Sequence, residues 1–338
     1  MDRVEDAATY RAMVVDKPLP DARPEAILRR GVEMGTVPAD ALEVDVLYSS
    51  VNYKDAVALT GGSGILKATP MVPGIDVVGR VRQAQGEWAE GDVVIVNGAG
   101  LGERTDGGLA ERSWLPLAAA VSLPDTMTAR SAAALGTAGF TAALSVQTLA
   151  TSVAPEDGEI LVTGAGGGVG MFAVALLAAR GYRVVAATGR GSSLGDTLRA
   201  LGAERVVGRE EIGSEVGKPL QSAQWAGAVD AVGGATLVNV LAQTRYGGVV
   251  TACGLAQGAD LPGTVLPFIL RGVTLAGINS VDASSDDRKR SWTDLAALDD
   301  AVVGTIAPRT EPLERAVTVA RDLLAGRVAG RVVIDVRA

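Results

Sequence analysis

The segment Glu159-Ile-Leu-Val-Thr-Gly-Ala-Gly-Gly-Gly-Val-Gly170 (EILVTGAGGGVG) is the clearest indication of the fold in this chain. Its first five residues form a short apolar run typical of a buried strand, and a glycine-rich turn follows at once. The next segment, 168–180, is apolar and long enough for a helix, and Gly181 suits the position just after a helix ends. A strand, a glycine loop and a helix in this order predict a loop whose backbone N–H groups hold a dinucleotide pyrophosphate.

The spacing of small residues in this loop departs at one position from the strict GxGxxG fingerprint. Counting back from Gly170 gives Gly167 and then Ala165, so the motif is AxGxxG. Alanine is tolerated there if that turn residue has a negative φ. A glycine run alone could be a flexible turn, but here a strand precedes it, and a helix and a second strand follow it. We therefore expect a dinucleotide to contact Gly164, Ala165, Gly166, Gly167, Gly168 and Val169.

Outward from the loop, short apolar segments alternate with helical ones. Predicted strands lie at 183–187, 205–207, 228–232, 248–252 and 273–278, with helices at 168–180 and 194–201. This alternation is typical of parallel βαβ units, so we expect an α/β fold with a doubly wound Rossmann sheet. Residues 10–127 differ, because they contain short apolar runs bounded by Gly and Pro, as in a small β-rich, barrel-like domain. The pattern changes near Thr128.

The end of the second strand bears on the choice of cofactor. Proteins that bind NAD place an Asp or Glu about 20 residues after the loop, where it bonds the ribose 2′-hydroxyl. Here that position falls in Ala187-Thr188-Gly189-Arg190, which contains no acid. Thr188 and Arg190 instead offer a hydroxyl and a planar fork of donors to a 2′-phosphate. Arg190 could also be a solvated loop residue, but its position favours NADPH.

The composition narrows the choice of partners. The chain has 338 residues, which suggests two domains, and a formal net charge of −8. An acidic chain without a basic block argues against nucleic acid or an anionic membrane surface as the main partner. No apolar run approaches the roughly 20 residues of a membrane span, and residues 1–13 lack the apolar core of a signal peptide.

The counts of cysteine and histidine bear on the cellular compartment of the protein and on its ability to bind zinc. The single cysteine, Cys253, cannot form an intrachain disulfide, which fits the reducing cytoplasm. The chain contains no histidine. Catalytic zinc sites mostly use three ligands drawn from His, Cys and carboxylates, and structural sites usually use four Cys or His. Neither usual kind of zinc site can therefore be built from these residues.

Several stretches give the chain a family resemblance. It resembles the zinc-free medium-chain dehydrogenases/reductases of the quinone-oxidoreductase group, and most of all the acrylyl-CoA reductase branch. The matching stretches cover almost the whole chain: SSVNYKDAVALTG (49–61), PMVPGIDVVGRV (70–81), GGLAE (107–111), LGTAGFTAALSV (135–146), VTGAGGGVG (162–170), ATGR (187–190), DAVGG (230–234), CGLAQGADLPGTVLPFILRGVTLAGINSV (253–281) and GRVAGRVVIDV (326–336). The 253–281 stretch is specific to the branch, whereas the glycine loop is not.

The resemblance implies a fold and an activity. The fold would be a GroES-like catalytic domain made of residues 1–127 and 296–338, with an inserted Rossmann domain, 128–295; such proteins are commonly homodimers. NADPH would give a hydride to the β-carbon of an α,β-unsaturated thioester or enone, and the α-carbon would then be protonated. Two alternatives stay open: an NADPH:quinone oxidoreductase, and a non-catalytic NADPH-binding protein on the same fold.

The resemblance also accounts for the absent zinc ligands. Zinc-dependent relatives carry a cysteine ligand where this chain has Asn52, and a histidine ligand, in a Gly-His-Glu run, where it has Gly74-Ile75-Asp76. Hydrogen-bond donors would then have to polarise the carbonyl group of the substrate.

The segment Asn52-Tyr53-Lys54-Asp55 follows a strand and opens a helix. A structural interpretation makes Asn52 the N-cap, places Asp55 at N3, and leaves Tyr53 as a packing residue. A catalytic interpretation gives Tyr53 the proton for the α-carbon, or a hydrogen bond to the thioester oxygen. Lys54 would then lower the pKa of Tyr53 or contact ribose or phosphate, and Asn52 would be a polar group of the active site. Water is the alternative proton donor.

The resemblance implies further cofactor contacts. Thr137 would approach the nicotinamide ribose or amide; otherwise it is a hydroxyl in a helical turn. Arg331 would lie near the cofactor or substrate; otherwise it lies on a solvated strand edge. Cys253 is not expected to act as a nucleophile, because it ends an apolar strand and has no histidine base. Backbone groups would line the cofactor at Cys253, Gly254, Leu255, Gly277, Ile278 and Asn279.

Two departures from close relatives bear on the substrate. The loop 61–67 carries fewer basic residues than in those relatives, where they would clamp CoA phosphates. Ala99 stands where relatives often carry tryptophan, which would reshape the pocket. An enone that is carrier-bound, or not a thioester, therefore stays open beside acrylyl-CoA.

Overall fold

A computed structural model describes residues 9–17, 22–33, 35, 38–213 and 215–338. Packing divides the chain into two compact units. Unit 1 comprises Met1–Thr137, Val281–Trp292 and Ala307–Ala338, and unit 2 comprises Ala138–Ser280 and Thr293–Ile306. The domain limits expected from the sequence, 1–127 with 296–338 and 128–295, stay a prediction. Residues 1–8, most of the segment for which no signal peptide is expected, lie outside the described residues.

Unit 2 is built on a parallel sheet of six strands in the order β10-β9-β8-β11-β12-β13. The strands are β8 (Glu159–Val162), β9 (Arg183–Ala187), β10 (Ala203–Val207), β11 (Trp225–Asp230), β12 (Thr244–Ala252) and β13 (Thr274–Gly277). Every neighbouring pair in this sheet is parallel. The strand order reverses between β8 and β11, and ligands of open α/β sheets bind at such a switch point.

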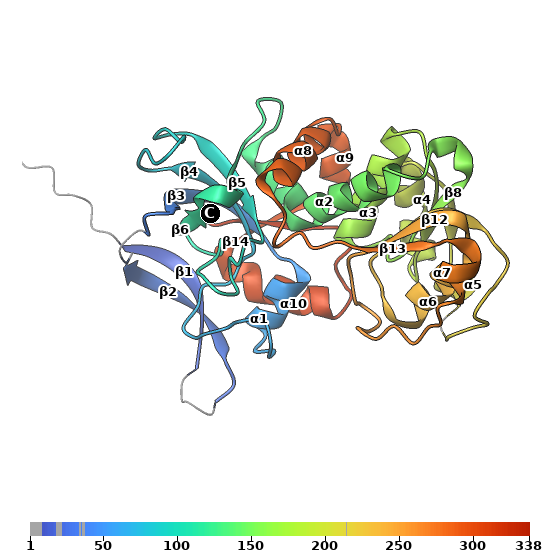
Figure 1. Ribbon diagram of the computed structural model, residues 1–338. Helices are drawn as coiled ribbons and strands as arrows, with labels where there is room; N and C mark the ends of the chain where they lie inside the picture. Colours follow the sequence, from blue (N-terminus) through green and yellow to red (C-terminus); the bar gives the residue numbers. More distant parts are fainter. Residues whose placement is uncertain (1–8, 18–21, 34, 36–37, 214) are drawn as a thin grey trace, which may run out of the picture. The chain divides into compact units, whose positions relative to one another are not determined.

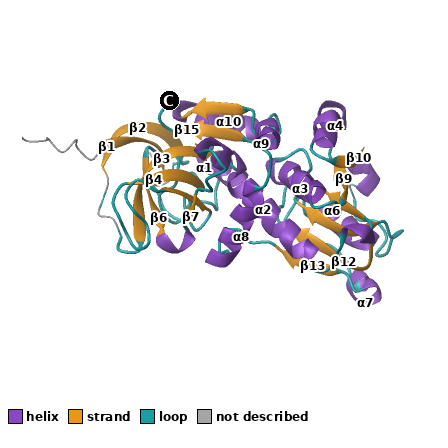
Figure 2. Cartoon of the chain, turned by 90° about the horizontal axis from the view of Figure 1, so that it is seen from above, coloured by secondary structure: helices purple, strands orange, loops and turns teal. Residues whose placement is uncertain are grey.

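Helices cover the sheet of unit 2 and bury its apolar strands. Helix α3 packs on β8, β9 and β10, and α6 packs on β11 and β12; Figure 2 shows both beside the strands, with α4 and α7. The fully buried side chains of Leu161, Val185 and Ala228 form the centre of this core. The helices of this part of the chain are α3 (Gly168–Ala179), α4 (Gly191–Ala200), α5 (Arg209–Ile212), α6 (Gly234–Gln243), α7 (Leu266–Arg271) and α9 (Asp300–Ile306), with the 3-10 helix η2 (Pro155–Asp157).

Unit 1 is β-rich. Its larger sheet has the order β14-β15-β3-β4-β5-β7, and β6 pairs with β3. The strands are β3 (Ala41–Ser50), β4 (Asp76–Val81), β5 (Val93–Asn97), β6 (Arg112–Pro116), β7 (Val121–Ser122), β14 (Arg309–Pro312) and β15 (Val332–Asp335). Strands β1 (Thr9–Asp16) and β2 (Glu25–Glu33) form a separate antiparallel pair. Met71, which precedes β4, makes an isolated antiparallel bridge to Val15 of β1.

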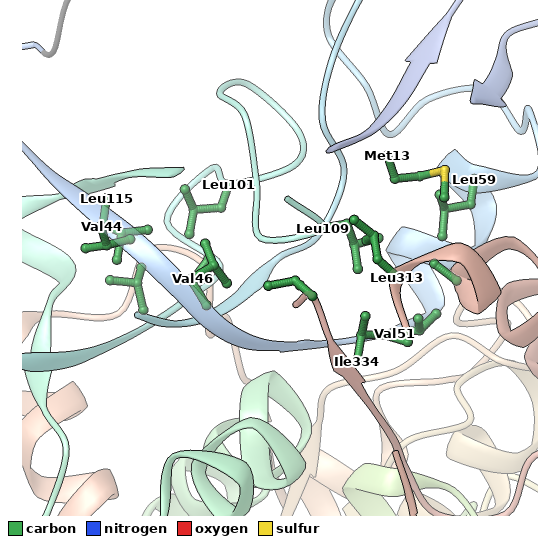
Figure 3. Packing of buried hydrophobic residues seen from close by; sticks show 14 of the residues in the cluster. Met13, Val44, Val46, Val51, Leu59, Leu101, Leu109, Leu115, Leu313 and Ile334 are labelled. Carbon is green, nitrogen blue, oxygen red and sulfur yellow. The ribbon is translucent and has the colours of Figure 1, made fainter. Parts of the chain in front are cut away.

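The two ends of the chain share the core of unit 1. Figure 3 shows Met13 and Leu59 close to each other, and Ile334 of β15 beside Val51. Helices α1 (Tyr53–Leu59) and α10 (Ala316–Leu324) lie side by side, although they come from opposite parts of the chain (Figure 1). The 3-10 helices η1 (Leu117–Ala119) and η3 (Leu313–Arg315) also belong to unit 1, and α8 (Ser285–Ala296) begins in it.

Helix α2 (Ala129–Ala150) corrects one expectation. The sequence suggested that no apolar segment reaches the length of a membrane span, but α2 is long and apolar enough by length and composition alone. Its alanines are only weakly apolar, so the segment does not stand out in the sequence. Of its most apolar window, 78% is buried inside the protein. Gly136, with φ 48° and ψ −153°, also breaks the helix into two parts. These are features of a core helix.

Candidate active site

A cluster of buried polar side chains lies at one end of four adjacent strands of unit 1. In β15, Val333 pairs with Ser50 of β3, so Arg331 comes next to the end of β3. In β4, Asp76 pairs with Asn97 of β5. Strand register therefore brings together residues that are far apart in the sequence. We call these side chains the Asp76 cluster: Ser50, Asn52, Asp55, Asp76, Asn97, Thr137 and Arg331.

The Asp76 carboxylate forms an ion pair at the centre of the cluster. Its Oδ2 accepts hydrogen bonds from Ser50 Oγ (2.5 Å), Asn52 Nδ2 (2.8 Å) and Arg331 Nη2 (3.0 Å). Burial alone would raise the pKa of Asp76, but Arg331 and the donors Asn52, Ser50 and Thr137 outweigh it and hold the pKa below its ordinary value. Asp76 is therefore ionised at neutral pH.

A break in helix α2 completes the shell around Asp76. The Oδ1 atom accepts hydrogen bonds from Asn97 Nδ2 (2.8 Å), Thr137 N (2.8 Å) and Thr137 Oγ1 (2.7 Å). A Cβ atom on Gly136 would lie 2.3 Å from Asp76 Oδ2 and 2.5 Å from Arg331 Nη2. Only glycine fits there, and its positive φ turns the Thr137 N–H toward the carboxylate. The structure thus places the Thr137 hydroxyl on Asp76.

Arg331 is enclosed by acceptors of the protein. Its Nε donates to Ala134 O (3.1 Å), Nη1 donates to Asn52 Oδ1 (2.5 Å), and Nη2 donates to Ser50 Oγ (2.6 Å) as well as to Asp76. Only 4% of Arg331 is exposed. It therefore does not lie on a solvated strand edge. The cofactor contact that the resemblance implies for Arg331 stays a prediction.

Asn52 is the N-cap of α1, as the structural interpretation expected, and both ends of its side-chain amide are hydrogen-bonded. Its Oδ1 accepts from Arg331, and its Nδ2 donates to Asp76 and, at 3.1 Å, to Asp55 Oδ2. The residue is 9% exposed. An amide nitrogen has two hydrogens, so none is left to polarise a substrate carbonyl. The expectation that Asn52 is a polar group of the active site stays a prediction.

Asp55 is a second buried carboxylate beside Asn52. Its Oδ2 accepts from Asn52 N (2.8 Å), and its Oδ1 accepts from Gly74 N (3.1 Å) and Ile75 N (2.9 Å). Burial raises the pKa of Asp55 to about 6; the nearby Asp76 charge adds to this effect, and the N–H donors oppose it. Asp55 is therefore mostly ionised at pH 7 and takes up a proton as the pH falls through about 6.

Tyr53 and Lys54 lie outside the cluster. Tyr53 is the first residue of α1, is 60% exposed, and its hydroxyl makes no hydrogen bond to any described residue. Lys54 Nζ forms an ion pair with Glu103 Oε1 at 2.6 Å. The ammonium is thus engaged by a carboxylate of the protein. Tyr53 carries the accessible donor of this segment.

A metal ion does not fit the Asp76 cluster. The carboxylate oxygens are occupied by hydrogen-bond donors, and the Arg331 guanidinium supplies the positive charge. Within the described ranges, no group of three or more His, Cys, Asp and Glu side chains could hold a metal ion. Asn52 and Ile75 stand where the resemblance implies zinc ligands in metal-dependent relatives. Here Asn52 is the N-cap of α1, and Ile75 donates its backbone N–H to Asp55.

In unit 2, the glycine loop packs tightly against the start of α3. Gly164 takes the positive φ of the turn (60°), and Ala165 does not have a positive φ, which meets the condition for alanine at this position. A Cβ atom on Gly170 would lie 2.4 Å from Gly164 O. Helix α3 begins at Gly168, so its first N–H groups lie next to the loop, where a pyrophosphate binds in such folds.

The side chains expected to select NADPH lie against this loop. Arg190 Nη2 donates to Gly166 O at 2.6 Å. A Cβ atom on Gly166 would lie 3.0 Å from Arg190 Nη2 and 3.1 Å from Thr188 Oγ1, so both side chains lie close against the loop. Thr188 follows β9 directly, and its Oγ1 accepts from Arg190 N (3.2 Å).

The sequence interpretation missed a second arginine at this place. A Cβ atom on Gly189 would lie 2.0 Å from Arg209 Nη2, so the Arg209 guanidinium rests on the backbone between Thr188 and Arg190. Arg209 follows β10 after Gly208 and is exposed. A basic residue just after the third strand is a signal that could have been recognised, because consecutive parallel strands end at the same edge of the sheet.

Asp230 links the two strands at the switch point. At the end of β11, its Oδ1 accepts from Thr163 Oγ1 (2.6 Å), next to the end of β8, and its Oδ2 accepts from Gly233 N (2.7 Å). Burial raises its pKa, and these donors oppose the effect. The Asp230 carboxylate thus fixes the loop after β11 to the first residue after β8.

The remaining predicted cofactor residues follow β12 and β13 at the same edge. The Cys253 thiol donates to Asp230 O (3.3 Å), and burial raises its pKa to about 12, so it is no nucleophile. A Cβ atom on Gly254 would lie 2.2 Å from Ala231 O. Leu255 is 61% exposed, and Ile278 N donates to Ala252 O (2.9 Å). Asn279, the next residue, is exposed.

Two protein families match the chain. The alcohol dehydrogenase GroES-like domain matches residues 38–125, and the zinc-binding dehydrogenase family matches residues 168–297. The predicted fold class, a GroES-like part and a doubly wound Rossmann part, is confirmed.

Individual relatives match almost the whole chain. Acrylyl-CoA reductase AcuI of Ruegeria pomeroyi is 43% identical over 97% of this chain and 100% of that protein. Putative quinone oxidoreductase YhfP of Bacillus subtilis is 43% identical over 88% of this chain and 91% of that protein. The crystal structure of the yhdH oxidoreductase from Salmonella enterica, in complex with NADP, has a TM-score of 0.91 and 41% identity, covering 96% of this chain and 99% of that one. The crystal structure of yhfP, with NAD bound, has a TM-score of 0.91 and 40% identity, covering 98% and 100%.

Proposed function

Because the chain belongs to the zinc-free medium-chain dehydrogenases/reductases, in the branch of the acrylyl-CoA reductases, we propose that it uses NADPH to reduce an activated C=C bond. The substrate would be an α,β-unsaturated thioester such as acrylyl-CoA, or an enone. The observation that carries the proposal is the pair Thr188 and Arg190 against Gly166, with no acidic side chain in the segment 187–190.

The carboxyl edge of the parallel sheet would hold NADPH. The pyrophosphate would lie on the loop and the first turn of α3, and the 2′-phosphate would lie between the guanidinium groups of Arg190 and Arg209. Backbone groups at Cys253, Gly254, Leu255, Ile278 and Asn279, and the side chain of Thr137, are proposed for the rest of the cofactor. When bound, NADPH supplies the hydride for the β-carbon of the substrate.

Tyr53 is the proposed donor of the proton to the α-carbon. Of the polar side chains that the sequence singled out in unit 1, Asn52, Lys54 and Thr137 are engaged by carboxylates. The Tyr53 hydroxyl is exposed and makes no hydrogen bond to any described residue. A phenol is a weak acid, but the carbon of an enolate is basic enough to accept its proton.

Replacing Tyr53 tests this role. Tyr53→Phe keeps the ring and removes the donor, so we expect kcat to fall about a hundredfold with little change in the affinity for NADPH. Single-turnover NADPH oxidation with a good substrate measures the chemical step. Tyr246→Phe is the control, because Tyr246 is 85% exposed in unit 2. Full turnover of Tyr53→Phe with chemistry rate-limiting would assign the proton to water.

Two classes of substrate are proposed: a CoA thioester, and an enone that is carrier-bound or not a thioester. The name of the R. pomeroyi relative favours acrylyl-CoA, whereas the loop 61–67 offers a single lysine to CoA phosphates. Ala99 adopts φ 52°, the one positive φ of a non-glycine residue in the described part of the chain. The small side chain there favours an enone or carrier-bound substrate. The name of the B. subtilis relative keeps quinone reduction as the alternative.

We also propose that the enzyme is a cytoplasmic homodimer without nucleic-acid or membrane partners. Strand β13 is the last strand of its sheet. The apolar side chains of Val265, Ile269 and Leu270, in and next to α7, are 63%, 68% and 58% exposed. Strands at a sheet edge and apolar patches commonly pair with a second chain. The acidic net charge supports the absence of nucleic-acid and membrane partners, and the single cysteine supports a cytoplasmic location.

The decisive experiment follows NADPH consumption with acrylyl-CoA, crotonyl-CoA, a free enone and a quinone. Saturable oxidation with a thioester or enone, and slower turnover with the quinone, is the expected result. A preference for the quinone would favour the alternative, and no turnover with any of them would favour the non-catalytic hypothesis. Equal use of NADH would contradict the roles of Thr188 and Arg190.

A further inference from the structure

We infer that Asp76 and Arg331 are positioning residues for the proposed reduction: their buried ion pair holds the start of helix α1, and thereby Tyr53, in place for proton delivery. The inference rests on the proposed function. It assigns no contact with substrate or cofactor to either residue.

The first step of the argument is what the pair joins. Arg331 donates to Ala134 O at the first part of α2, to Asn52 Oδ1 after β3, and to Asp76 at the start of β4. Asp76 in turn binds Thr137 after the break in α2. The ion pair therefore joins four segments that are distant in the sequence: the end of β3, the start of β4, helix α2 and the residues before β15.

The second step is the link to Tyr53. Asn52 directly precedes Tyr53 and is held through both ends of its amide, by Arg331 at Oδ1 and by Asp76 and Asp55 at Nδ2. Its backbone N–H is also bound, to Asp55 Oδ2 at 2.8 Å. No rotation of Asn52 is compatible with all of these bonds, so the first turn of α1 has a fixed origin. A donor displaced by about 1 Å can lose about a hundredfold in rate.

The third step is that only a guanidinium satisfies this geometry. Its three nitrogens reach acceptors in three directions: Ala134 O, Asn52 Oδ1, and the pair of Ser50 Oγ and Asp76 Oδ2. A lysine at this position would keep the charge but would present it from a single nitrogen. Arg331→Lys therefore separates the role of the positive charge from the role of the three donor nitrogens of the guanidinium group.

The test compares Arg331→Lys with Arg130→Lys. Arg130 also joins α2 to the C-terminal part of the chain, through Thr310 Oγ1 (2.9 Å) and Ala307 O (2.9 Å), but it lies outside the cluster. We expect Arg331→Lys to lower kcat between about tenfold and about a hundredfold, while the NADPH dissociation constant changes less than about threefold. The solvent isotope effect on kcat should rise, because proton delivery becomes slower. Arg130→Lys should keep the wild-type values.

A milder variant covers the case in which Arg331→Lys does not fold. Ser50→Ala removes one hydroxyl that binds both Arg331 and Asp76, and we expect the same pattern at a smaller size, about threefold in kcat. Guanidinium ion added to Arg331→Ala should restore part of the lost turnover.

The outcomes separate the two proposals. If the wild type oxidises NADPH with no thioester or enone, the proposed function fails. If the wild type is active and both cluster variants keep kcat, the positioning role is wrong. If Arg331→Lys instead weakens NADPH binding more than about tenfold at unchanged kcat, Arg331 is a cofactor ligand and the inference is overturned.

Discussion

A buried charge is tolerated only with a partner, and this chain buries two carboxylates side by side. Asp76 has Arg331 and several donors, whereas Asp55 has only N–H donors, and Asp76 lies close to it. The pKa values of the two acids are therefore shifted in opposite directions: that of Asp76 is lowered and that of Asp55 is raised. The free energy of unfolding should reflect this difference.

The Asp55 contribution can be isolated. Because burial and the Asp76 charge raise the pKa of Asp55 from 3.8 to about 6, native protein binds this proton more tightly than unfolded protein does. Its contribution to stability is full below pH 3.8 and is lost as the pH rises through about 6. The loss amounts to about 3 kcal/mol. Urea unfolding at several pH values gives the free energy of unfolding of the wild type and of Asp55→Asn. Between pH 4 and pH 7, we expect the wild type to lose about 3 kcal/mol of this free energy relative to Asp55→Asn. A difference independent of pH would contradict the assignment.

Cofactor choice is also decided by single residues. Arg190→Ala should weaken NADPH binding about tenfold to a hundredfold, because a charge-assisted hydrogen bond to the 2′-phosphate is lost, and should leave NADH binding nearly unchanged. Arg209→Ala should show the same selectivity at a smaller size, since Arg209 is exposed. Titration of each variant with both cofactors measures this. The control is Arg199→Ala, an exposed arginine of α4 paired with Asp196. Equal loss of both cofactors in Arg190→Ala would mean that its bond to Gly166 O only shapes the loop.

At the scale of elements, helix α2 depends on one glycine. Gly136→Ala would place a Cβ atom inside the buried ion pair and would force φ 48° on an alanine. We expect a loss of at least about 3 kcal/mol in the free energy of unfolding, because the pair must separate or the helix must move. Gly304→Ala is the matched control: Gly304 lies inside α9, and a Cβ atom added there would meet open space, so alanine should be neutral or stabilising by up to about 1 kcal/mol. Urea unfolding measures both, and equal stabilities would contradict the role of the break.

Helices and strands that have a local sequence pattern were predictable. A site that depends on which distant strands pair with each other was not. The strand, loop and helix around 159–180 follow from local composition, and the structure has β8 and α3 there. The Asp76 cluster depends on which strands pair, and no local pattern specifies that β15 returns to β3. One signal was present: Asp76 is an acid inside the apolar run Ile75 to Val78, where a charge is costly unless it is paired. The partner Arg331 could not have been found locally.

At the scale of the whole molecule, association should depend on the exposed edge of unit 2. The double variant Ile269→Asp, Leu270→Asp replaces two exposed apolar side chains of α7 with charged ones, so we expect a monomer at concentrations where the wild type is a dimer. Sedimentation velocity measures the mass. Ile27→Asp is the control, because Ile27 is 48% exposed in β2 of unit 1. A wild type that sediments as a monomer would refute the dimer.

The position of Arg331 late in the sequence has a consequence for synthesis on the ribosome. Every segment of unit 2 ends by Ile306, so that unit can fold before Arg331 has been translated. Asp76 emerges early but has no counter-charge until β15 leaves the exit tunnel, so the nascent β-rich part cannot close its polar centre. A nascent chain of this protein should therefore acquire its dinucleotide-binding part first, and the N-terminal part should stay open to chaperones and proteases until Arg331 has emerged.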